Sequence, residues 1–182
     1  MIHRGKDFEN QTFKSREYVG DEFDFMHFSE CTFQYCDFSG SIFQNSSFWN
    51  CRFEECKLNG IDFGSTNITG CDFSGSIIKN STFHTAPSNN KNRQKTLDLA
   101  GCKFTNTNLE RSVFYSCNLN GVSFSKSVVV QTVFEECNLT KSDYTASELS
   151  GANFIKCKTK GTIIDIGGAI TLAQNKGFTL GE

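Results

Sequence analysis

Cysteine is the residue whose number first suggests chemistry in this chain. The sequence has nine cysteines and three histidines among its 182 residues. Thiolates and imidazoles are the usual zinc ligands, and closely placed thiols form disulfides. A zinc site is built from close pairs such as Cys-x₂-Cys, and the sequence contains no such pair. We therefore expect no metal at these residues.

Acid–base catalysis is the second chemistry to consider, and it would need a histidine or carboxylate beside an apolar pocket. His3 lies in a short N-terminal tail, and His27 stands at an outward position of the pattern described below. The acidic residues also occupy outward polar positions. The sequence has no glycine-rich phosphate-binding loop and no nucleophile elbow. We expect a protein that is not an enzyme and that has no cofactor.

A period of five residues organises most of the chain. Counting by fives from Phe8 reaches an aromatic or aliphatic residue at every step to Phe83. After a shift of one residue the series resumes from Leu99 to Phe154. Of the 19 phenylalanines, 17 lie on this series. A period of five fits neither an α-helix nor an ordinary strand. It indicates a coil in which each group of five residues forms one side and turns a corner.

A second spacing, of 20 residues, indicates four sides to each coil. Three glycines recur at this spacing, and so do two columns of aromatic residues. The glycines are Gly20, Gly40 and Gly60, and the columns are Phe23, Phe43, Phe63, Phe83 and Phe13, Phe33, Phe53, Phe73. Rings stacked at the usual strand spacing of about 4.8 Å would form a continuous core.

The repeated units resemble those of the pentapeptide repeat family. Examples are CysAspPheSerGly at 36–40 and 71–75, CysLysLeuAsnGly at 56–60 and CysAsnLeuAsnGly at 117–121. The resemblance covers roughly residues 6–161. It implies an all-β fold, a right-handed four-sided parallel β-helix (a pentapeptide repeat solenoid). The whole chain, 1–182, would then be one domain of about eight coils, on the order of 40 Å long.

All nine cysteines stand two residues before a core position of this pattern. They are Cys31, Cys36, Cys51, Cys56, Cys71, Cys102, Cys117, Cys137 and Cys157. Cβ atoms one coil apart would be separated by about 4.8 Å, which is beyond the usual disulfide distance. We expect small buried thiols that fill a narrow core. Nine free thiols favour a reducing compartment, and therefore a cytoplasmic protein.

Residues 86–96 interrupt the repeat and are expected to form an inserted loop. Phe83 and Leu99 are 16 residues apart, which is three repeats and one residue. We therefore expect this segment to replace two sides of one coil, so that Phe104 follows Phe83 in its column and Gly101 continues the glycine corner. The basic residues of the loop are either solvated or contact a partner. These candidates are Lys91, Arg93 and Lys95.

Residues 162–182 are expected to cap the last coil. Asp165 can cap a short helix that Gly177 would end. The apolar residues of this helix are Ile166, Ala169, Ile170 and Ala173. They would form either a lid alone or a lid that also joins a second copy into a homodimer. The candidates for the cap and the dimer contact are Ile166, Ile170, Leu172, Phe178 and Leu180.

Charge is divided unevenly along the chain. Residues 1–75 carry 12 acidic and six basic residues, whereas residues 76–182 carry eight and 12. The densest acidic group contains Asp21, Glu22 and Asp24, and it is either a solvated surface or a patch for a basic partner. Trp49 follows a core Phe and should face solvent, as a lone aromatic or an interface anchor. The net charge of −2 argues against direct nucleic-acid binding, and no apolar run suits a membrane or a signal peptide.

Two functional hypotheses remain. The first is a protein-interaction scaffold whose partner the sequence does not name. The alternative comes from the resemblance, because some pentapeptide repeat proteins bind DNA gyrase or topoisomerase IV and protect them from quinolones or toxins through DNA mimicry. The inserted loop and the expected dimer fit that group. The basic C-terminal half departs from the strongly acidic surface that DNA mimicry implies.

Overall fold

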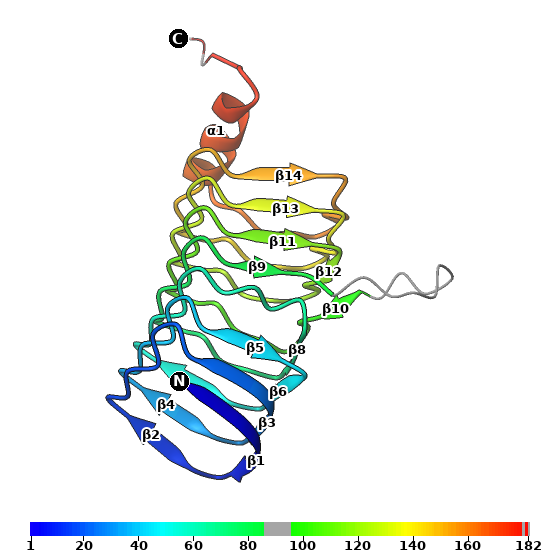
Figure 1. The fold of residues 1–182 in the computed structure, drawn as a ribbon. Coiled ribbons are helices and arrows are strands. Elements are labelled where there is room, and N and C mark those ends of the chain that lie inside the picture. The colour runs from blue at the N-terminus through cyan, green and yellow to red at the C-terminus, as the bar shows by residue number, and fades with distance from the viewer. Residues whose placement is uncertain (86–95, 180, 182) are drawn as a thin grey trace.

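The repeats form a parallel β-solenoid of about seven turns that is followed by one helix (Figure 1). The computed structural model describes residues 1–85, 96–179 and 181.

The strands fall into four sheets. The first sheet contains β1 (Ile2–Glu9), β3 (Glu22–Ser29), β5 (Ile42–Gln44), β6 (Ser46–Trp49) and β8 (Thr66–Thr69). The second contains β2 (Thr12–Lys14), β4 (Thr32–Gln34) and β7 (Arg52–Glu54). The third contains β9 (Thr82–Phe83), β11 (Val113–Tyr115), β13 (Val133–Glu135) and β14 (Asn153–Ile155), and the fourth contains β10 (Leu97–Asp98) and β12 (Cys117–Asn118).

Corners recur every five residues because the backbone there adopts a positive φ. In one coil these corners are Asn10, Ser15, Gly20 and Phe25, and Glu30 is the first corner of the next coil. Glycine and asparagine adopt this conformation most easily, which explains their frequency in the repeat. Phe25, which lies outside the five-residue series of phenylalanines, occupies such a corner with a φ of 53° and is exposed.

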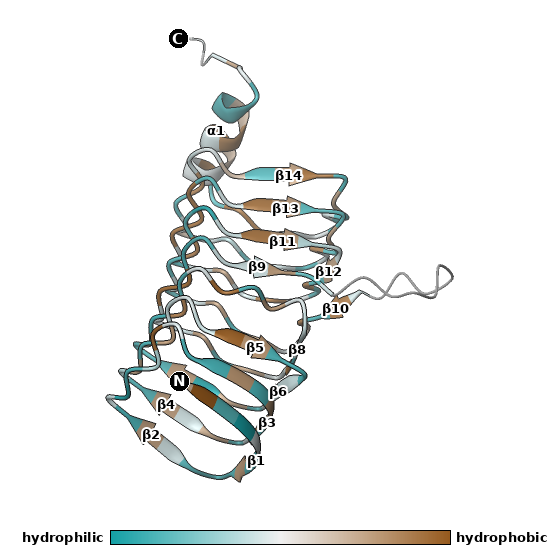
Figure 2. Cartoon of the chain, in the orientation of Figure 1, coloured by the Kyte–Doolittle hydropathy of each residue, from teal (hydrophilic) through white to brown (hydrophobic). Residues whose placement is uncertain are grey.

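The core is a stack of inward-facing rings and small side chains. Phe13, Phe33 and Phe53 lie one above the other, with ring centroids 5.1 and 5.0 Å apart. Successive columns meet edge to face, as Phe28 and Phe33 do at 5.3 Å. Figure 2 shows the apolar segments at corresponding places of successive coils, for example in β5, β11 and β13. The expected ladder of aromatic residues is therefore confirmed.

The register across the insertion differs from the sequence-based expectation. Successive coils elsewhere pair residues 20 positions apart, but Thr82 pairs with Val113, 31 positions later. Eleven residues are thus added to a complete coil and replace none of its sides. Phe114, not Phe104, stacks on Phe83, at 4.5 Å. Phe104 instead stacks on Phe73, at 5.2 Å. This half-turn difference accounts for about seven turns in place of the expected eight.

The glycine corner is corrected in the same way. Gly60 donates its N–H to Lys79 O at 2.8 Å, and Asn80 in turn donates to Glu110 O at 3.0 Å. The corner that begins with Gly20, Gly40 and Gly60 therefore continues through Asn80 and Arg111 and not through Gly101. The expectation failed because one extra residue and eleven extra residues shift the five-residue series by the same amount.

The N-terminal residues extend the solenoid instead of forming a tail. Strand β1 pairs with β3 from Ile2 onward. His3 occupies a core position of the five-residue series, and its ring stacks on Phe23 with centroids 4.6 Å apart. The first sheet thus begins ahead of residue 6.

Helix α1 (Ile166–Asn175) has the predicted ends. The Asp165 carboxylate accepts a hydrogen bond from Gly168 N at 2.7 Å. After the helix, Gly177 N donates to Gln174 O and Phe178 N donates to Ala173 O, which is a Schellman motif. No helix in the described part of the chain is long and apolar enough to cross a membrane.

The face of α1 that packs on the solenoid is not the one that the apolar residues suggested. Gly168 is buried above Leu149, Leu172 packs on the core, and Asn175 donates to Leu149 O at 2.9 Å. Ile166 and Ala169 are exposed instead, Ile166 to 82%. Glycine allows the helix to approach Leu149 closely, which an isoleucine at that position could not. The side chain of Leu180 lies outside the described residues.

Candidate functional site

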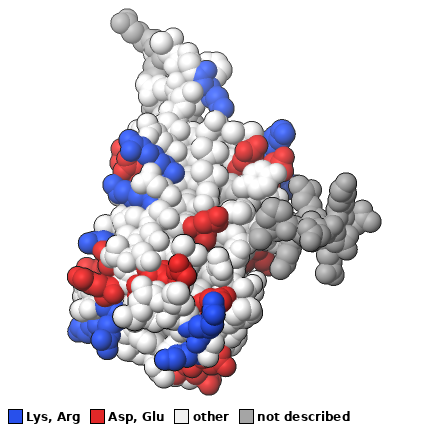
Figure 3. Space-filling model, viewed as in Figure 1, with Lys and Arg blue, Asp and Glu red and all other residues white. Residues whose placement is uncertain are grey.

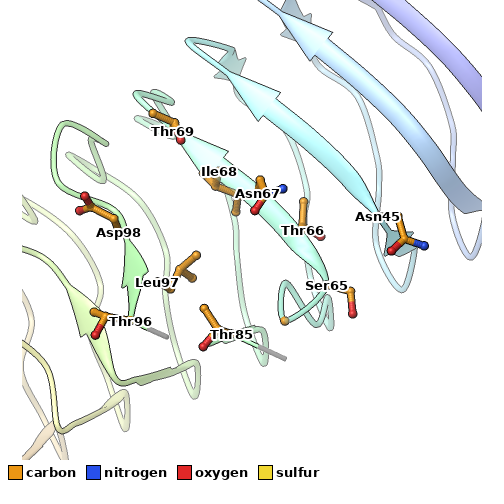
Figure 4. Close-up of a pocket in the computed structure, with 11 residues that line it drawn as sticks. Asn45, Ser65, Thr66, Asn67, Ile68, Thr69, Thr85, Thr96, Leu97 and Asp98 are labelled. Carbon is orange, nitrogen blue, oxygen red and sulfur yellow. The ribbon is translucent and has the colours of Figure 1, made fainter. Parts of the chain in front are cut away.

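A groove lies on the face of the solenoid where the insertion enters and leaves (Figure 4). It has a volume of about 410 Å³ and is lined by β8, by β10 and by Thr85 and Thr96. On the three other sides the same two coils stay paired, through Asp62–Thr82, Asp72–Lys103 and Ile77–Asn108. Within residues 1–85 and 96–179, by contrast, β8 pairs only with β6, and β10 pairs only with β12. The groove therefore marks a gap between β8 and β10 in the ladder on this side of the solenoid.

The lining of this groove is suited to hydrogen bonding more than to charge recognition. Its side chains include Asn45, Ser65, Asn67 and Asp98. The Asp98 carboxylate already accepts bonds from Ala100 N at 3.1 Å and from Asn118 Nδ2 at 2.9 Å. The described residues contain no group of three or more His, Cys, Asp or Glu side chains that could hold a metal.

Trp49 lies on the same face as the groove. It ends β6, and its backbone pairs with Thr69 of β8, which lines the groove. The side chain is 48% exposed, as the sequence predicted. We call the surface formed by Trp49, β8 and β10 the Trp49 face. The structure thus places one predicted contact residue on the same face as the groove, one coil before β8, while Lys91, Arg93 and Lys95 lie outside the described residues.

His84 is held at the base of the insertion, and sequence reasoning did not single it out. Its Nε2 lies 2.7 Å from Asp62 Oδ1, and its Nδ1 lies 3.1 Å from Thr85 O. The ring covers Gly64, where a Cβ would come within 2.4 Å of the imidazole. Because both ring nitrogens have partners, His84 positions the chain here and is not poised as a base. Its partner Asp62 belongs to the preceding coil, so the residues around His84 in the sequence do not indicate this contact.

The predicted acidic group is largely paired with bases of the first strand. Asp21 lies 2.8 Å from His3 Nε2, and Asp24 accepts from Arg4 Nε at 3.0 Å. Burial acts to raise the pKa of Asp21, but hydrogen bonds from the N-terminus and His3 outweigh it and hold this pKa below its ordinary value. Glu22 is exposed on β3. The group is therefore less anionic as a surface than its sequence suggests.

Opposite charges also pair between successive coils along the rest of the solenoid. The pairs include Asp37–Lys57 at 3.3 Å, Asp72–Lys103 at 3.5 Å, Lys79–Glu110 at 2.7 Å and Glu136–Lys156 at 3.7 Å. Both signs are interspersed on the face seen in Figure 3. The described surface is therefore mixed in charge.

The C-terminal end exposes apolar side chains. Phe178 is 69% exposed, and Ile163 and Ile166 are also exposed. Of the predicted cap and dimer residues, Leu172 packs on the core and Ile170 is half-buried.

Comparison with known proteins identifies the repeat and the fold. The profile of the pentapeptide repeat region matches residues 6–83 and 95–164. A structure of trypsin-treated QnrB1, described as a plasmid-mediated fluoroquinolone resistance protein, matches with a TM-score of 0.56 and 17% identity, over 98% of this chain and 92% of that chain. HetL, a pentapeptide repeat protein involved in heterocyst differentiation regulation in Nostoc sp. strain PCC 7120, matches with a TM-score of 0.31 and 12% identity over 90% and 91%. No curated protein matches the sequence. At these identities the structural likeness to QnrB1 shows the fold alone.

Proposed function

Because the chain belongs to the pentapeptide repeat family, we propose that it is a non-enzymatic scaffold that binds another protein through the Trp49 face. The observation that carries this proposal is the gap between β8 and β10 on the same face as the exposed indole. An exposed tryptophan on the same face as strand edges that are unpaired within the described residues offers apolar area together with hydrogen-bonding groups, a combination typical of interface centres.

The test is capture of a partner by variants that differ at one aromatic residue. Trp49→Ala should remove a partner that the wild-type protein retains from a cell extract. Tyr115→Ala is the matched control, because Tyr115 is also exposed but lies on β11. Equal retention by the two variants would contradict the proposal that the Trp49 face is the binding surface.

A second candidate function is protection of DNA gyrase or topoisomerase IV from quinolones or toxins. The match to QnrB1 along nearly the whole chain and the insertion in mid-chain support it. The mixed charge of the described surface speaks for contact through the insertion rather than through DNA mimicry. A supercoiling assay with purified gyrase and ciprofloxacin tests it, using the wild-type protein and a variant that lacks residues 86–96. Protection that disappears with the segment would support this function, and no effect from either protein would rule it out for gyrase.

We also propose that two copies join at the C-terminus and that the protein is cytoplasmic. Exposed Ile166 and Phe178 support the homodimer, because they lie away from the helix face that packs on the solenoid. Nine unpaired thiols support a reducing compartment. Light scattering should give twice the chain mass for the wild type and the monomer mass for Ile166→Ser/Phe178→Ser. A wild-type monomer at all accessible concentrations would contradict the dimer.

A further inference from the structure

The outward charges on one side of the solenoid are separated by sign. This side contains the Trp49 face and runs from β1, β3, β6 and β8 across the gap to β10 and β12 (Figure 1). Each coil presents outward there the residue before and the residue after one central position. We call it the Trp49 side. Its central positions are Phe8, Phe28, Phe48 and Ile68 before the gap and Leu99, Leu119, Leu139 and Thr159 after it.

The N-terminal end of the Trp49 side is acidic. Asp7 and Glu9 flank Phe8, and Glu30 stands at the corner that follows the next central position. All three acidic side chains belong to exposed residues. None of them has an ion-pair partner within the described part of the chain.

The C-terminal end of the same side is basic. Lys158 and Lys160 flank Thr159, and Lys141 stands at the corner one coil earlier. These three lysines are exposed, and in residues 1–85 and 96–179 they too have no ion-pair partner. Several opposite charges on other sides, by contrast, pair between successive coils. The charges of the Trp49 side are therefore left for a contact outside the chain.

The two charged ends are too far apart to neutralise each other within one copy. Seven strand spacings of about 4.8 Å place Asp7 about 34 Å from Lys158, several times the Debye length of about 8 Å at physiological salt. The outward side chains between them are mostly neutral, such as Ser47 and Asn67. Asp98 carries a charge, but its carboxylate accepts a hydrogen bond from Asn118 Nδ2 at 2.9 Å.

A half-turn about the gap exchanges the acidic positions with the basic ones. A twofold axis that lies along the strand direction, between β8 and β10, brings the first strand of one copy over the last coil of a second copy. Residues that precede a central position then face each other, and so do those that follow one. The facing pairs are Asp7 with Lys158, Glu9 with Lys160 and Glu30 with Lys141, with the two members of each pair in different copies. Because the axis is twofold, each pair forms twice.

We propose that the protein bound by the Trp49 face is a second copy of this chain, packed on the Trp49 side with the two solenoids antiparallel. This inference rests on the proposed function, since it names the partner of that face. The contact is about 34 Å long and about 15 Å wide, on the order of 500 Å² per copy, which is at the lower end of specific interfaces. It is therefore a weak contact that depends on salt, and it differs from the apolar contact proposed for the C-terminus.

The first test separates the two contacts by salt. It uses the full-length chain with Ile166→Ser/Phe178→Ser, which removes the C-terminal contact, and follows association by sedimentation equilibrium. This parent protein should form dimers at about 50 mM NaCl, and its dissociation constant should rise at least tenfold at about 500 mM, where it becomes monomeric. A parent that is monomeric at low salt up to the highest soluble concentration would overturn the proposal.

The second test reverses the charges at each end of the parent protein. Lys158→Glu/Lys160→Glu makes both ends acidic, and Asp7→Lys/Glu9→Lys makes both ends basic. Each variant alone should dimerise at least tenfold more weakly than the parent, because like charges then face each other. An equimolar mixture of the two should dimerise, since every acidic end then meets a basic one. A chain with all four changes should recover self-association.

The matched control is Lys14→Glu/Lys126→Glu, which changes the net charge of the parent equally on another side of the solenoid. Both lysines are exposed and have no ion-pair partner among the residues that the structure describes. The control should dimerise within about twofold of the parent. Equal weakening by the control would assign the effect to net charge and overturn the proposal, as would a mixture of the two end variants that stays monomeric.

The result also distinguishes this inference from the function on which it rests. Trp49→Ala should weaken self-association of the parent, because the indole lies on the same side. If Trp49→Ala instead loses a partner from the cell extract while the charge reversals leave self-association unchanged, the face binds a different protein. The proposed function then stands and this inference fails. Circular dichroism of each variant shows that it is folded, and recovery in the mixture excludes misfolding as the cause of a loss.

Discussion

At the scale of single residues, the buried thiols act as hydrogen-bond donors within the core. The Cys51 thiol donates to Phe28 O at 3.4 Å, and the Cys71 thiol donates to Phe48 O at 3.4 Å. Serine takes the same place elsewhere, since Ser76 Oγ donates to Phe53 O at 2.8 Å. Burial raises the pKa of the Cys102 thiol to about 11, so the group keeps its proton at neutral pH. Cysteine and serine thus make the same hydrogen bond to a carbonyl of the preceding coil.

This role predicts how a buried cysteine responds to substitution. Cys51→Ser retains a donor to Phe28 O, whereas Cys51→Ala leaves that carbonyl without its thiol partner. We expect Cys51→Ala to reduce the free energy of unfolding by about 1–3 kcal/mol and Cys51→Ser to reduce it less. Urea denaturation measures both. A larger loss for serine than for alanine would show that volume, and not hydrogen bonding, determines the residue at this position.

Sequence reasoning was most successful for residues that follow the five-residue period. The solvent exposure of Trp49 and the burial of eight of the nine cysteines came directly from their place in the repeat, and the ninth, Cys157, is half-buried. The role of His84 could not be predicted. It depends on Asp62 and Gly64, which the preceding coil supplies at the same side, and the sequence does not show this directly.

At the scale of elements, the structure explains why the insertion was misplaced by half a turn. The columns that contain Phe73 and Phe83 are both aromatic and lie two sides apart. Exchanging them leaves the hydrophobic pattern unchanged. Only the hydrogen-bonded register, such as Thr82 with Val113, distinguishes the two arrangements. The groove at β8 and β10 was likewise unpredictable, because no residue type marks the place where a ladder opens.

The register predicts that the insertion can be removed without loss of the fold. Deleting residues 86–96 restores the regular spacing of 20 residues, so Leu97 would follow the coil of Thr66 in phase. We expect a cooperatively unfolding protein with a melting temperature equal to or above that of the wild type, measured by circular dichroism. If the segment instead replaced two sides of a coil, its deletion would remove core layers. The variant would then lose stability or fail to fold.

Helix α1 should depend on pH through Asp165. Hydrogen bonds from Gly168 N and Ala146 N lower the pKa of this carboxyl below its ordinary value. A lowered folded-state pKa means that its stabilisation is complete above the ordinary aspartate pKa and is lost as the pH falls through the folded-state value. We therefore expect the helical circular dichroism signal to decrease below about pH 4. In Asp165→Asn this decrease should be absent, and its persistence would assign the transition to another group.

At the scale of the whole molecule, stability comes from contacts between neighbouring coils and not from one central core. Each coil contacts only the coils above and below it, as in other solenoids. Phe83 joins the two halves of the chain, with ring centroids 4.7 Å from Phe63 and 4.5 Å from Phe114. A defect at this layer would weaken the coupling between the halves.

Substitution of Phe83 should therefore have a large effect. We expect Phe83→Ala to lower the free energy of unfolding by about 3–5 kcal/mol in urea denaturation. Hydrogen exchange should become faster first in the coils next to residue 83. Phe178→Ala is the control and should leave stability nearly unchanged, because this side chain is largely exposed. Uniform loss of protection along the chain would show that the solenoid unfolds as one unit.

The additive insertion between Thr85 and Leu97 has a consequence for how such a protein can evolve. Because the coils on either side stay paired despite the 11 extra residues, we expect mutations that lengthen, shorten or replace this segment to change the stability of the solenoid little. Recognition can then diversify rapidly while the solenoid is conserved by its own packing. A library randomised at this site should consist largely of folded proteins, which would make the chain a practical scaffold for selecting new binding specificities.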